Sequence, residues 1–446
     1  MGRRMNRRMT LGTATALVVV VTLASPARAS EVPAAPTFAK DVAPIFQAKC
    51  EACHRADSMA PMSLKTFAEV RPWVRSIRAR VADRQMPPWQ IERSVGIQKF
   101  KNDRSLTDDE RATVLKWIDS GAPQGDAKDM PPPVSWPEDQ GWNFAAQFGQ
   151  KEPDLIVKSE PFTMPALAQD AWDHRITPSG ITEPRWVRAI EIRPATVKGR
   201  RITHHAIAYL EQPEGVAGGG AAPAGLGALF MEWAVGKQGE LMRPDTGKLL
   251  MPGAQFRWDI HYSQAGEEIT SQVEMGIYFY PKDQEPKYRT MLSLVPAALG
   301  TLDIRPNTVS IVEGFTTLRD NARIESFQPH MHLRGKAMMV EALLPTGQKQ
   351  VLSYVRDFNF NWMTSYVYAD DVAPLLPKGT ILKVTAWHDN TAAKESNPDP
   401  SQWVGWGDRT VDEMAHAWIN IVYMKDEDFK VEQEKRKATT STLPQQ

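Results

Sequence analysis

The sequence VSIVEGFTT at residues 309–317 is typical of the larger part of this 446-residue chain. It is rich in β-branched and aromatic residues, which favour extended strands. From about Glu152 onward, similar short runs alternate with turn signals, for example at 186–192, 272–280 and 381–387. Short strands at this spacing are the pattern of an all-β sandwich or jelly roll. We therefore predict that most of the chain is β-structure.

The residues that precede the β-rich part predict a small all-α module at residues 30–128. Residues 37–49 carry apolar side chains at helical spacing, namely Phe38, Val42, Ile45 and Phe46. Residues 105–120 form a second predicted helix, because Thr107 and Glu110 have the spacing of a capping box. A proline-rich linker is predicted at 129–150.

Both ends of the chain are predicted to lie outside the folded part. The first 29 residues have the layout of a signal peptide, with a basic start, an apolar stretch at 11–24 and the cleavage signal Ala27-Arg28-Ala29. The alternative, an uncleaved membrane anchor, would need a longer apolar stretch. The sequence thus predicts a periplasmic or otherwise exported protein. The charged tail at 431–446 is predicted to be disordered.

The charge balance gives no reason to expect a nucleic-acid partner. Lysine and arginine number 53 together, and so do aspartate and glutamate. A strongly basic chain would be expected if the protein bound nucleic acid or an anionic membrane.

The sequence Cys50-Glu51-Ala52-Cys53-His54 is the C-x-x-C-H attachment signal for c-type haem. The two thiols would bind the haem covalently, and His54 would bind its iron. Alternative interpretations are a thioredoxin-like redox pair or half of a zinc site. The motif follows a predicted helix rather than a strand, and the chain has no further cysteine. Both observations favour haem.

Methionine is the usual second axial ligand of iron in electron-transfer cytochromes. The candidates are Met59, Met62 and Met86. The first two follow His54 closely, so reaching the opposite haem face would require a very tight chain reversal. Met86 lies in a Met-Pro-Pro-Trp segment, and the module resembles small class I-type cytochromes, including this segment. We predict Met86 as the ligand, with Met62 as the alternative.

Five of the nine histidines fall in three clusters within the β-rich part. They are the adjacent pair His204-His205, the single His261, and the H-x-H pair His330 and His332. On a strand, residues two apart face the same side, so His330 and His332 can chelate one ion. The adjacent pair can share a metal only at a bulge or a strand end. Imidazole suits copper, zinc, iron and nickel, so these residues predict a transition-metal site.

The order of these clusters, followed by Met414 in Thr410-Val411-Asp412-Glu413-Met414, resembles the copper type II, ascorbate-dependent monooxygenases. This is the family of the peptidylglycine hydroxylating and dopamine β-monooxygenases. The resemblance covers roughly residues 150–425. It implies two jelly-roll subdomains, at 151–300 and 301–430, that face a solvent cleft. Their boundary is expected near residues 295–310.

The resemblance also implies two copper ions with different roles. His204, His205 and His261 match the electron-storing copper site. His330, His332 and Met414 match the catalytic, oxygen-activating site, where a thioether favours Cu(I). The remaining histidines of the β-rich part have no motif support and are expected to be structural: His174, His388 and His416.

The sequence also departs from the family. The peptide-amidating members carry an arginine, an asparagine and a tyrosine for substrate contact, and the matching positions here are Gln328, His416 and Trp418. The β-rich part has no cysteine, whereas animal members carry several disulfides. These departures argue against a peptide carboxylate as the substrate.

The function predicted from the sequence is an exported copper-dependent monooxygenase. It would use O2 to hydroxylate a C–H bond of a small organic substrate, with electrons passing from a periplasmic donor through haem c. The alternative is a periplasmic haem and copper protein for electron transfer or copper binding, without hydroxylase activity. A third interpretation is that the haem is structural or acts as a sensor.

Overall fold

The computed structural model describes residues 32–56, 58, 60, 62–134, 141–212, 228–234, 237 and 239–441. The predicted signal peptide lies outside the described residues, and so does Met59. Within the described part, no helix has both the length and the apolar composition needed to cross a membrane.

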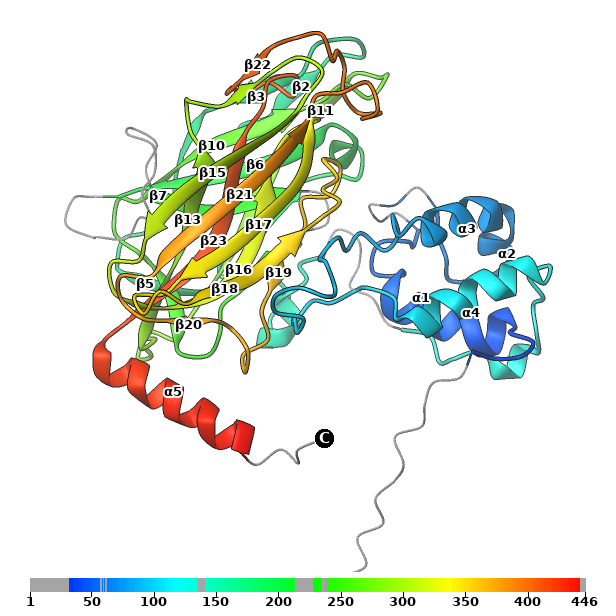
Figure 1. The fold of residues 1–446 in the computed structure, drawn as a ribbon, viewed down its shortest axis with the longest axis horizontal. Coiled ribbons are helices and arrows are strands. Elements are labelled where there is room, and N and C mark those ends of the chain that lie inside the picture. The colour runs from blue at the N-terminus through cyan, green and yellow to red at the C-terminus, as the bar shows by residue number, and fades with distance from the viewer. Residues whose placement is uncertain are drawn as a thin grey trace, which may run out of the picture.

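The chain is mostly β-structure, as predicted, and most of its helices lie in the N-terminal third. Figure 1 shows α1 to α4 gathered apart from the strands. The helical elements before the first strand are η1 (Phe38–Val42), α1 (Ala43–Lys49), α2 (Phe67–Val70), η2 (Arg71–Trp73), α3 (Val74–Ala82), α4 (Asp108–Asp119), η3 (Ala127–Asp129) and η4 (Ala145–Phe148). The predicted capping box is confirmed at α4, where Thr107 accepts a hydrogen bond from the Glu110 backbone and Glu110 reaches back to Thr107. Such a box satisfies backbone donors that the first turn of a helix leaves free.

These helices pack around a small apolar core of their own. Phe38 and Phe46 lie on one face of η1 and α1, as their spacing predicts, and Phe38 contacts the fully buried Trp117 of α4 with ring centroids 5.9 Å apart. Val42, Val70 and other buried side chains complete the cluster.

The strands up to residue 279 form the first β-subdomain. They are β1 (Leu155–Lys158), β2 (Phe162–Met164), β3 (Ala171–Asp173), β4 (Ile176–Pro178), β5 (Arg185–Pro194), β6 (Thr203–Glu211), β7 (Ala228–Ala234), β8 (Gly239–Leu241), β9 (Thr246–Leu250), β10 (Gln255–Tyr262), β11 (Ile269–Ser271) and β12 (Val273–Phe279), with η5 (Gly199–Arg201) before β6. One sheet holds β1-β12-β5-β9, and the sheet β3-β10-β6-β7 faces it. Their inner faces share one apolar core, which includes Ile190, Trp258 and Met275.

The strands from residue 288 onward form the second β-subdomain. They are β13 (Tyr288–Ala298), β14 (Asp303–Ile304), β15 (Val309–Thr317), β16 (Asn321–His330), β17 (Gly335–Leu343), β18 (Lys349–Val355), β19 (Tyr366–Val367), β20 (Leu375–Leu376), β21 (Ile381–Asp389), β22 (Val404–Gly405) and β23 (Ala415–Met424). The sheet β13-β23-β16-β19 packs against the sheet β15-β21-β17-β18.

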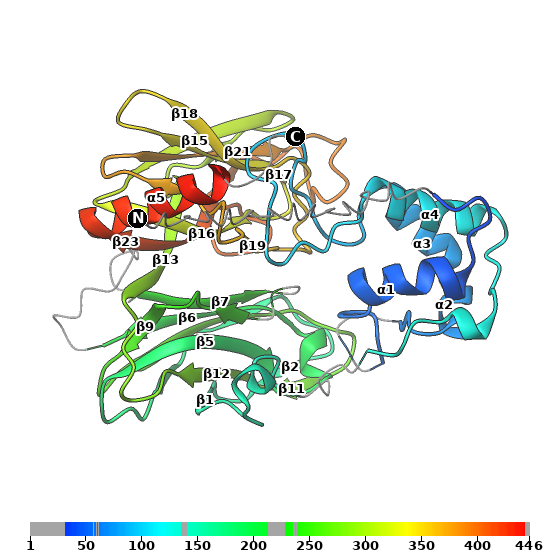
Figure 2. The ribbon, with the colours of Figure 1, turned by 90° about the horizontal axis from the view of Figure 1, so that it is seen from below.

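The two subdomains are joined through one continuous sheet. A short parallel pairing of β9 with β13 links the order β1-β12-β5-β9 to β13-β23-β16-β19, and Figure 2 shows β13 between the two groups of strands. Every residue of β16 is buried, whereas β15 alternates between exposed and half-buried residues. Burial on both faces is expected of a strand that lies between its own core and another layer. The strand β16 therefore lies at the contact between the subdomains.

Three predicted boundaries are wrong. The second subdomain begins at β13, before the expected break at 295–310, because β13 pairs with β23 from Thr290 to Ala298. The predicted linker at 129–150 ends before Trp142, which is buried against Tyr278 of the first subdomain. The tail is helical over α5 (Asp426–Ser441) rather than disordered, because Phe429 is buried against the end of β23.

The helical part does not stand alone, because residues 89–102 extend from it onto the second subdomain. Ile91 and Phe100 form isolated backbone bridges with Val355 and Tyr368, and their side chains join the apolar core of that subdomain. Helices α1 to α4 thus lie within the predicted range 30–128, but residues 89–102 pack as part of the second β-subdomain.

Candidate metal centre

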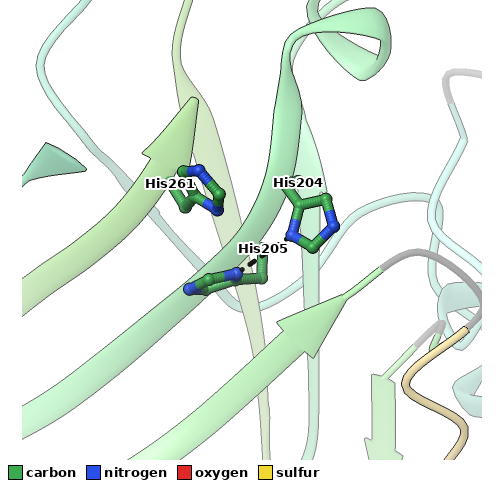
Figure 3. A group of neighbouring side chains, drawn as sticks. All are labelled: His204, His205 and His261. Atoms are coloured by element: carbon green, nitrogen blue, oxygen red, sulfur yellow. Dashed lines mark hydrogen bonds between the residues drawn. The ribbon is translucent and has the colours of Figure 1, made fainter. Parts of the chain in front are cut away.

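The first histidine group lies where β6 begins and β10 ends. His205 is opposite His261, and Thr203 is opposite Tyr262, so His204 is an extra residue in its strand. This is a β-bulge, which turns two consecutive side chains to the same side. The sequence-based condition for a shared ion at His204 and His205 is therefore met, and Figure 3 shows both rings close to His261.

The spacing of these three rings fits one metal ion. One ligand atom from each of His204, His205 and His261 lies within 4.8 Å of the other two, and no other group of three or more histidine, cysteine or acidic residues in the described part is that compact. The Nδ1 atoms of His204 and His205 are 3.2 Å apart. Three imidazoles form a donor set that suits copper as well as zinc.

His261 is held in place from outside the group. Its Nε2 donates a hydrogen bond to the Asp170 carboxylate at 3.0 Å, and its ring stacks on Trp172 with centroids 4.6 Å apart. A carboxylate on the outer nitrogen fixes the orientation of a metal-binding histidine. The same Asp170 oxygen accepts a hydrogen bond from Thr410 of the second subdomain, so it also links the two halves.

The second histidine group lies at the end of β16 and directly after it. His330 and His332 are both buried, and their ring centroids are 5.5 Å apart. His332 Nδ1 donates to the backbone carbonyl of Asp412 at 3.0 Å, which leaves its Nε2 for a metal ion.

Glu413 joins the H-x-H segment to the segment that carries Met414. Its fully buried carboxylate accepts hydrogen bonds from the backbone N–H groups of His332 at 2.8 Å, Arg334 at 2.5 Å and Met414 at 3.3 Å. Burial raises the pKa of Glu413 to about 7. His388 adds a further constraint, because its Nε2 donates to the Met414 carbonyl at 3.1 Å. Both residues are positioning residues for the predicted ligands, and the sequence motif gave a signal only for Glu413.

The imidazoles of both groups are held in the neutral form that metal binding requires. Burial lowers the pKa of His204 and of His332 to about 4, and it lowers the pKa of His205, His261 and His330 as well. These side chains are therefore uncharged near neutral pH, with one ring nitrogen free of a proton.

The two histidine groups lie side by side instead of across an open cleft. The rings of His205 and His330 have centroids 6.2 Å apart. Phe360 of the second subdomain stacks on His204 at 4.7 Å and lies 6.0 Å from His332. The prediction of a solvent cleft is therefore wrong at this point of the structure. Apolar contacts of Trp418 with β6 and β7 hold the two subdomains against one another.

His416 is a third histidine beside His330 that has no support in any sequence motif. It is directly opposite His330 in the pairing of β16 with β23, and the two rings stack with centroids 4.5 Å apart. Gln328, two residues before His330, is opposite Trp418, two residues after His416. Gln328 donates a hydrogen bond to Glu232 of the first subdomain at 2.7 Å. By contrast, His174 is largely exposed and pairs with Asp259.

The cysteine motif forms a turn directly after α1. The backbone N–H groups of Cys53 and His54 both donate to the Cys50 carbonyl, and both thiols are free. Burial raises the pKa of Cys50 to about 12 and also raises the pKa of Cys53. A thioredoxin-like pair requires a lowered thiol pKa, so this alternative is disfavoured.

The surroundings of His54 and Met86 bear on the axial ligands. His54 Nδ1 donates to the Met62 carbonyl at 3.3 Å, which leaves Nε2 for iron. This bond holds the Met62 backbone beside Nδ1, the ring nitrogen of His54 that would face away from the iron. Met86 lines a cavity of about 730 Å³ between the helices and Arg356 to Asn359 of the second subdomain. His54 is not among the residues that line this cavity.

Comparison with known proteins gives no assignment. No protein-family model matches the chain, and no curated protein matches it. Among solved structures, the uncharacterized protein lmo2446 from Listeria monocytogenes EGD-e has 12% identity and a TM-score of 0.16, over 60% of this chain and 20% of that chain. The VP2 subviral particle of infectious bursal disease virus has 9% identity and a TM-score of 0.17, over 65% of this chain and 74% of that chain. Similarities this low carry no argument about fold or function.

Proposed function

We propose that this protein is an exported, copper-dependent monooxygenase that receives electrons through a covalently bound haem c. The observation that carries the proposal is the convergence of two histidine groups from two subdomains, with His205 and His330 rings 6.2 Å apart. The resemblance to the ascorbate-dependent copper monooxygenases assigns the first group to electron storage and the second to oxygen chemistry.

The overall reaction of the proposed enzyme consumes one O2, two electrons and two protons. One oxygen atom enters a C–H bond of a small organic substrate to give an alcohol, and the other leaves as water. Bound copper would supply one-electron redox chemistry and bind O2. His204, His205 and His261 would hold one ion, and His330, His332 and Met414 the other.

The protein's own residues would orient these ligands and exclude bulk water. Asp170 fixes His261, and Glu413 fixes both the H-x-H segment and the backbone at Met414. Because His330 and His332 are buried, the chemistry would take place away from bulk solvent, where electrostatic interactions are stronger.

A short connection between the helical part and the second histidine group supports electron entry through a haem. Trp89, three residues beyond Met86, packs against Tyr366 with ring centroids 4.8 Å apart. Tyr366 in turn contacts Phe327 of β16 at 6.1 Å, and this strand ends at His330. Cys50, Cys53 and His54 would hold the haem, with Met86 as the second axial ligand.

Haem content and haem ligation can be tested separately. Protein from a host that matures c-type cytochromes should give one covalent haem per chain in a pyridine haemochrome assay, and its absence would contradict the proposal. Met86→Ala should open the iron to carbon monoxide, whereas Met62→Ala should keep the wild-type spectrum. The reverse result would assign Met62 as the ligand.

Oxygen chemistry is tested by reoxidation of the reduced, copper-loaded protein. O2 should reoxidise its haem much faster than the haem of a Met414→Ala variant, and substrate screening should reveal compounds that increase O2 uptake. The alternative function, electron transfer or copper binding alone, is favoured by the burial of the histidines in a closed interface. Equal reoxidation rates in both proteins would support that alternative.

A further inference from the structure

His416 is a buried histidine whose two ring nitrogens have no hydrogen-bond partner among the described residues. The residue is 2% exposed, so bulk water does not take the place of a partner. Buried polar groups are nearly always satisfied, and each exception requires an explanation. A neutral imidazole offers a lone pair on one ring nitrogen.

The position of His416 relates it to the second histidine group. It is paired with His330 across neighbouring strands, and the two rings stack at 4.5 Å. The Nδ1 atom of His330 also lacks a partner within the described part of the chain. It follows that the pair presents three buried nitrogen atoms without partners at a single place. One ion at the shared edge of the two stacked rings, where the in-plane lone pairs point, would satisfy one nitrogen of each.

We infer that His416 is an additional ligand of the metal held by His330 and His332, so that the second site has three histidines. This inference rests on the proposed function, in which that site binds copper. The site would then have as many imidazoles as the first, with Met414 as a fourth donor. Three imidazoles and a thioether suit a copper ion that cycles between Cu(I) and Cu(II).

The His416 ring is held by its contacts with His330 and Trp418, and no hydrogen bond to a described residue fixes it. The ligand atoms of His330, His332 and His416 do not all lie within 4.8 Å of one another, so binding requires some ring rotation. When it rotates, His416 gives up no hydrogen bond to any residue that the structure describes. His261 differs in this respect, since its ring is fixed by Asp170.

The experiment compares His416→Ala and His416→Asn with the exposed control His174→Ala. Copper content, Cu(II) electron paramagnetic resonance and competition with a copper chelator are measured for each protein. If His416 is a ligand, both variants lose second-site affinity by about tenfold or more, since ligand number sets affinity. The control keeps the wild-type copper content and spectrum. Asparagine can form hydrogen bonds, so wild-type affinity and spectrum in His416→Asn would overturn the inference.

A second measurement does not depend on the folding of these variants. X-ray absorption on the copper that remains in His204→Ala should show three imidazoles and one sulfur ligand. Two imidazoles would overturn the inference while leaving the proposed function intact. Wild-type protein that binds no copper would instead overturn the proposed function itself.

Discussion

The two histidine groups are built from similar strand ends, but they are stabilised in different ways. In the first group, one ligand is oriented by the carboxylate of Asp170 and by stacking on Trp172. In the second group, the backbone is fixed by Glu413, while His330 and His416 keep unpartnered ring nitrogens. The first group is thus organised around its side chains before metal binds. In the second, the Asp412 carbonyl orients the His332 ring, whereas His330 Nδ1 and both ring nitrogens of His416 have no hydrogen-bond partner among the described residues.

The largest effect is expected for Glu413→Ala, which should disrupt the second group and spare the first. Three backbone N–H groups would lose their acceptor, and each unsatisfied buried donor costs about 1–3 kcal/mol. The free energy of unfolding, measured by denaturant titration of the apo-protein, should fall by about 4 kcal/mol. Glu413→Gln keeps one acceptor oxygen and should lose less. Equal copper loss from both histidine groups would show that Glu413 does not act on the second group alone.

Acid should destabilise the apo-protein through its buried histidines. Burial lowers the pKa of His332 to about 4, whereas the unfolded chain takes up this proton near pH 6.5. The stabilisation is complete above pH 6.5 and is lost as the pH falls toward 4, to a limit of about 3 kcal/mol for this residue. His332→Gln should reduce this dependence, as seen in thermal melts between pH 7 and pH 4.

The exposed His174 is a control, because its pKa is shifted in the opposite direction to that of His332. Its hydrogen bond with Asp259 raises its pKa, so His174 contributes stability below its ordinary pKa and loses it as the pH rises. His174→Gln should therefore not reduce the acid-induced loss and should make it slightly larger, because the variant lacks this stabilisation at low pH. Copper should protect against that loss, because bound imidazoles do not take up protons.

A smaller and more local effect is expected for Asp170→Asn. Removing the charge from the outer partner of His261 should lower the copper affinity of the first group by about 10–100-fold. The second group should retain its affinity in chelator competition. Thr410→Val removes only the other hydrogen bond to Asp170, so it should leave both affinities close to wild type. A comparable loss in Thr410→Val would mean that Asp170 acts mainly by joining the subdomains.

The sequence predicted the local elements of this protein well. The strand at Val309–Thr317 and the capping box at Thr107 both have the predicted bounds or geometry. The bulge at His204 could be anticipated because two adjacent histidines can face one ion only at such an irregularity. These features depend on neighbouring residues, whose effects can be read from a single stretch of sequence.

The features that the sequence did not reveal depend on contacts between distant segments. The pairing of β16 with β23 places His416 opposite His330, and no spacing in the chain encodes that register. The closed contact of His205 with His330 depends on how two complete sandwiches pack. The tail was predicted to be disordered from its charge, but one buried side chain, Phe429, anchors it as a helix.

The central claim is that two copper ions occupy two separate histidine groups. It is tested most directly by copper quantification with Cu(II) electron paramagnetic resonance on the wild type, His204→Ala and Met414→Ala. We predict about two equivalents in the wild type and about one in His204→Ala. In Met414→Ala the histidines of the second group can still hold Cu(II), so copper content should fall only in part while Cu(I) affinity collapses. A wild type with one copper or none, and unaltered spectra in both variants, would contradict the account.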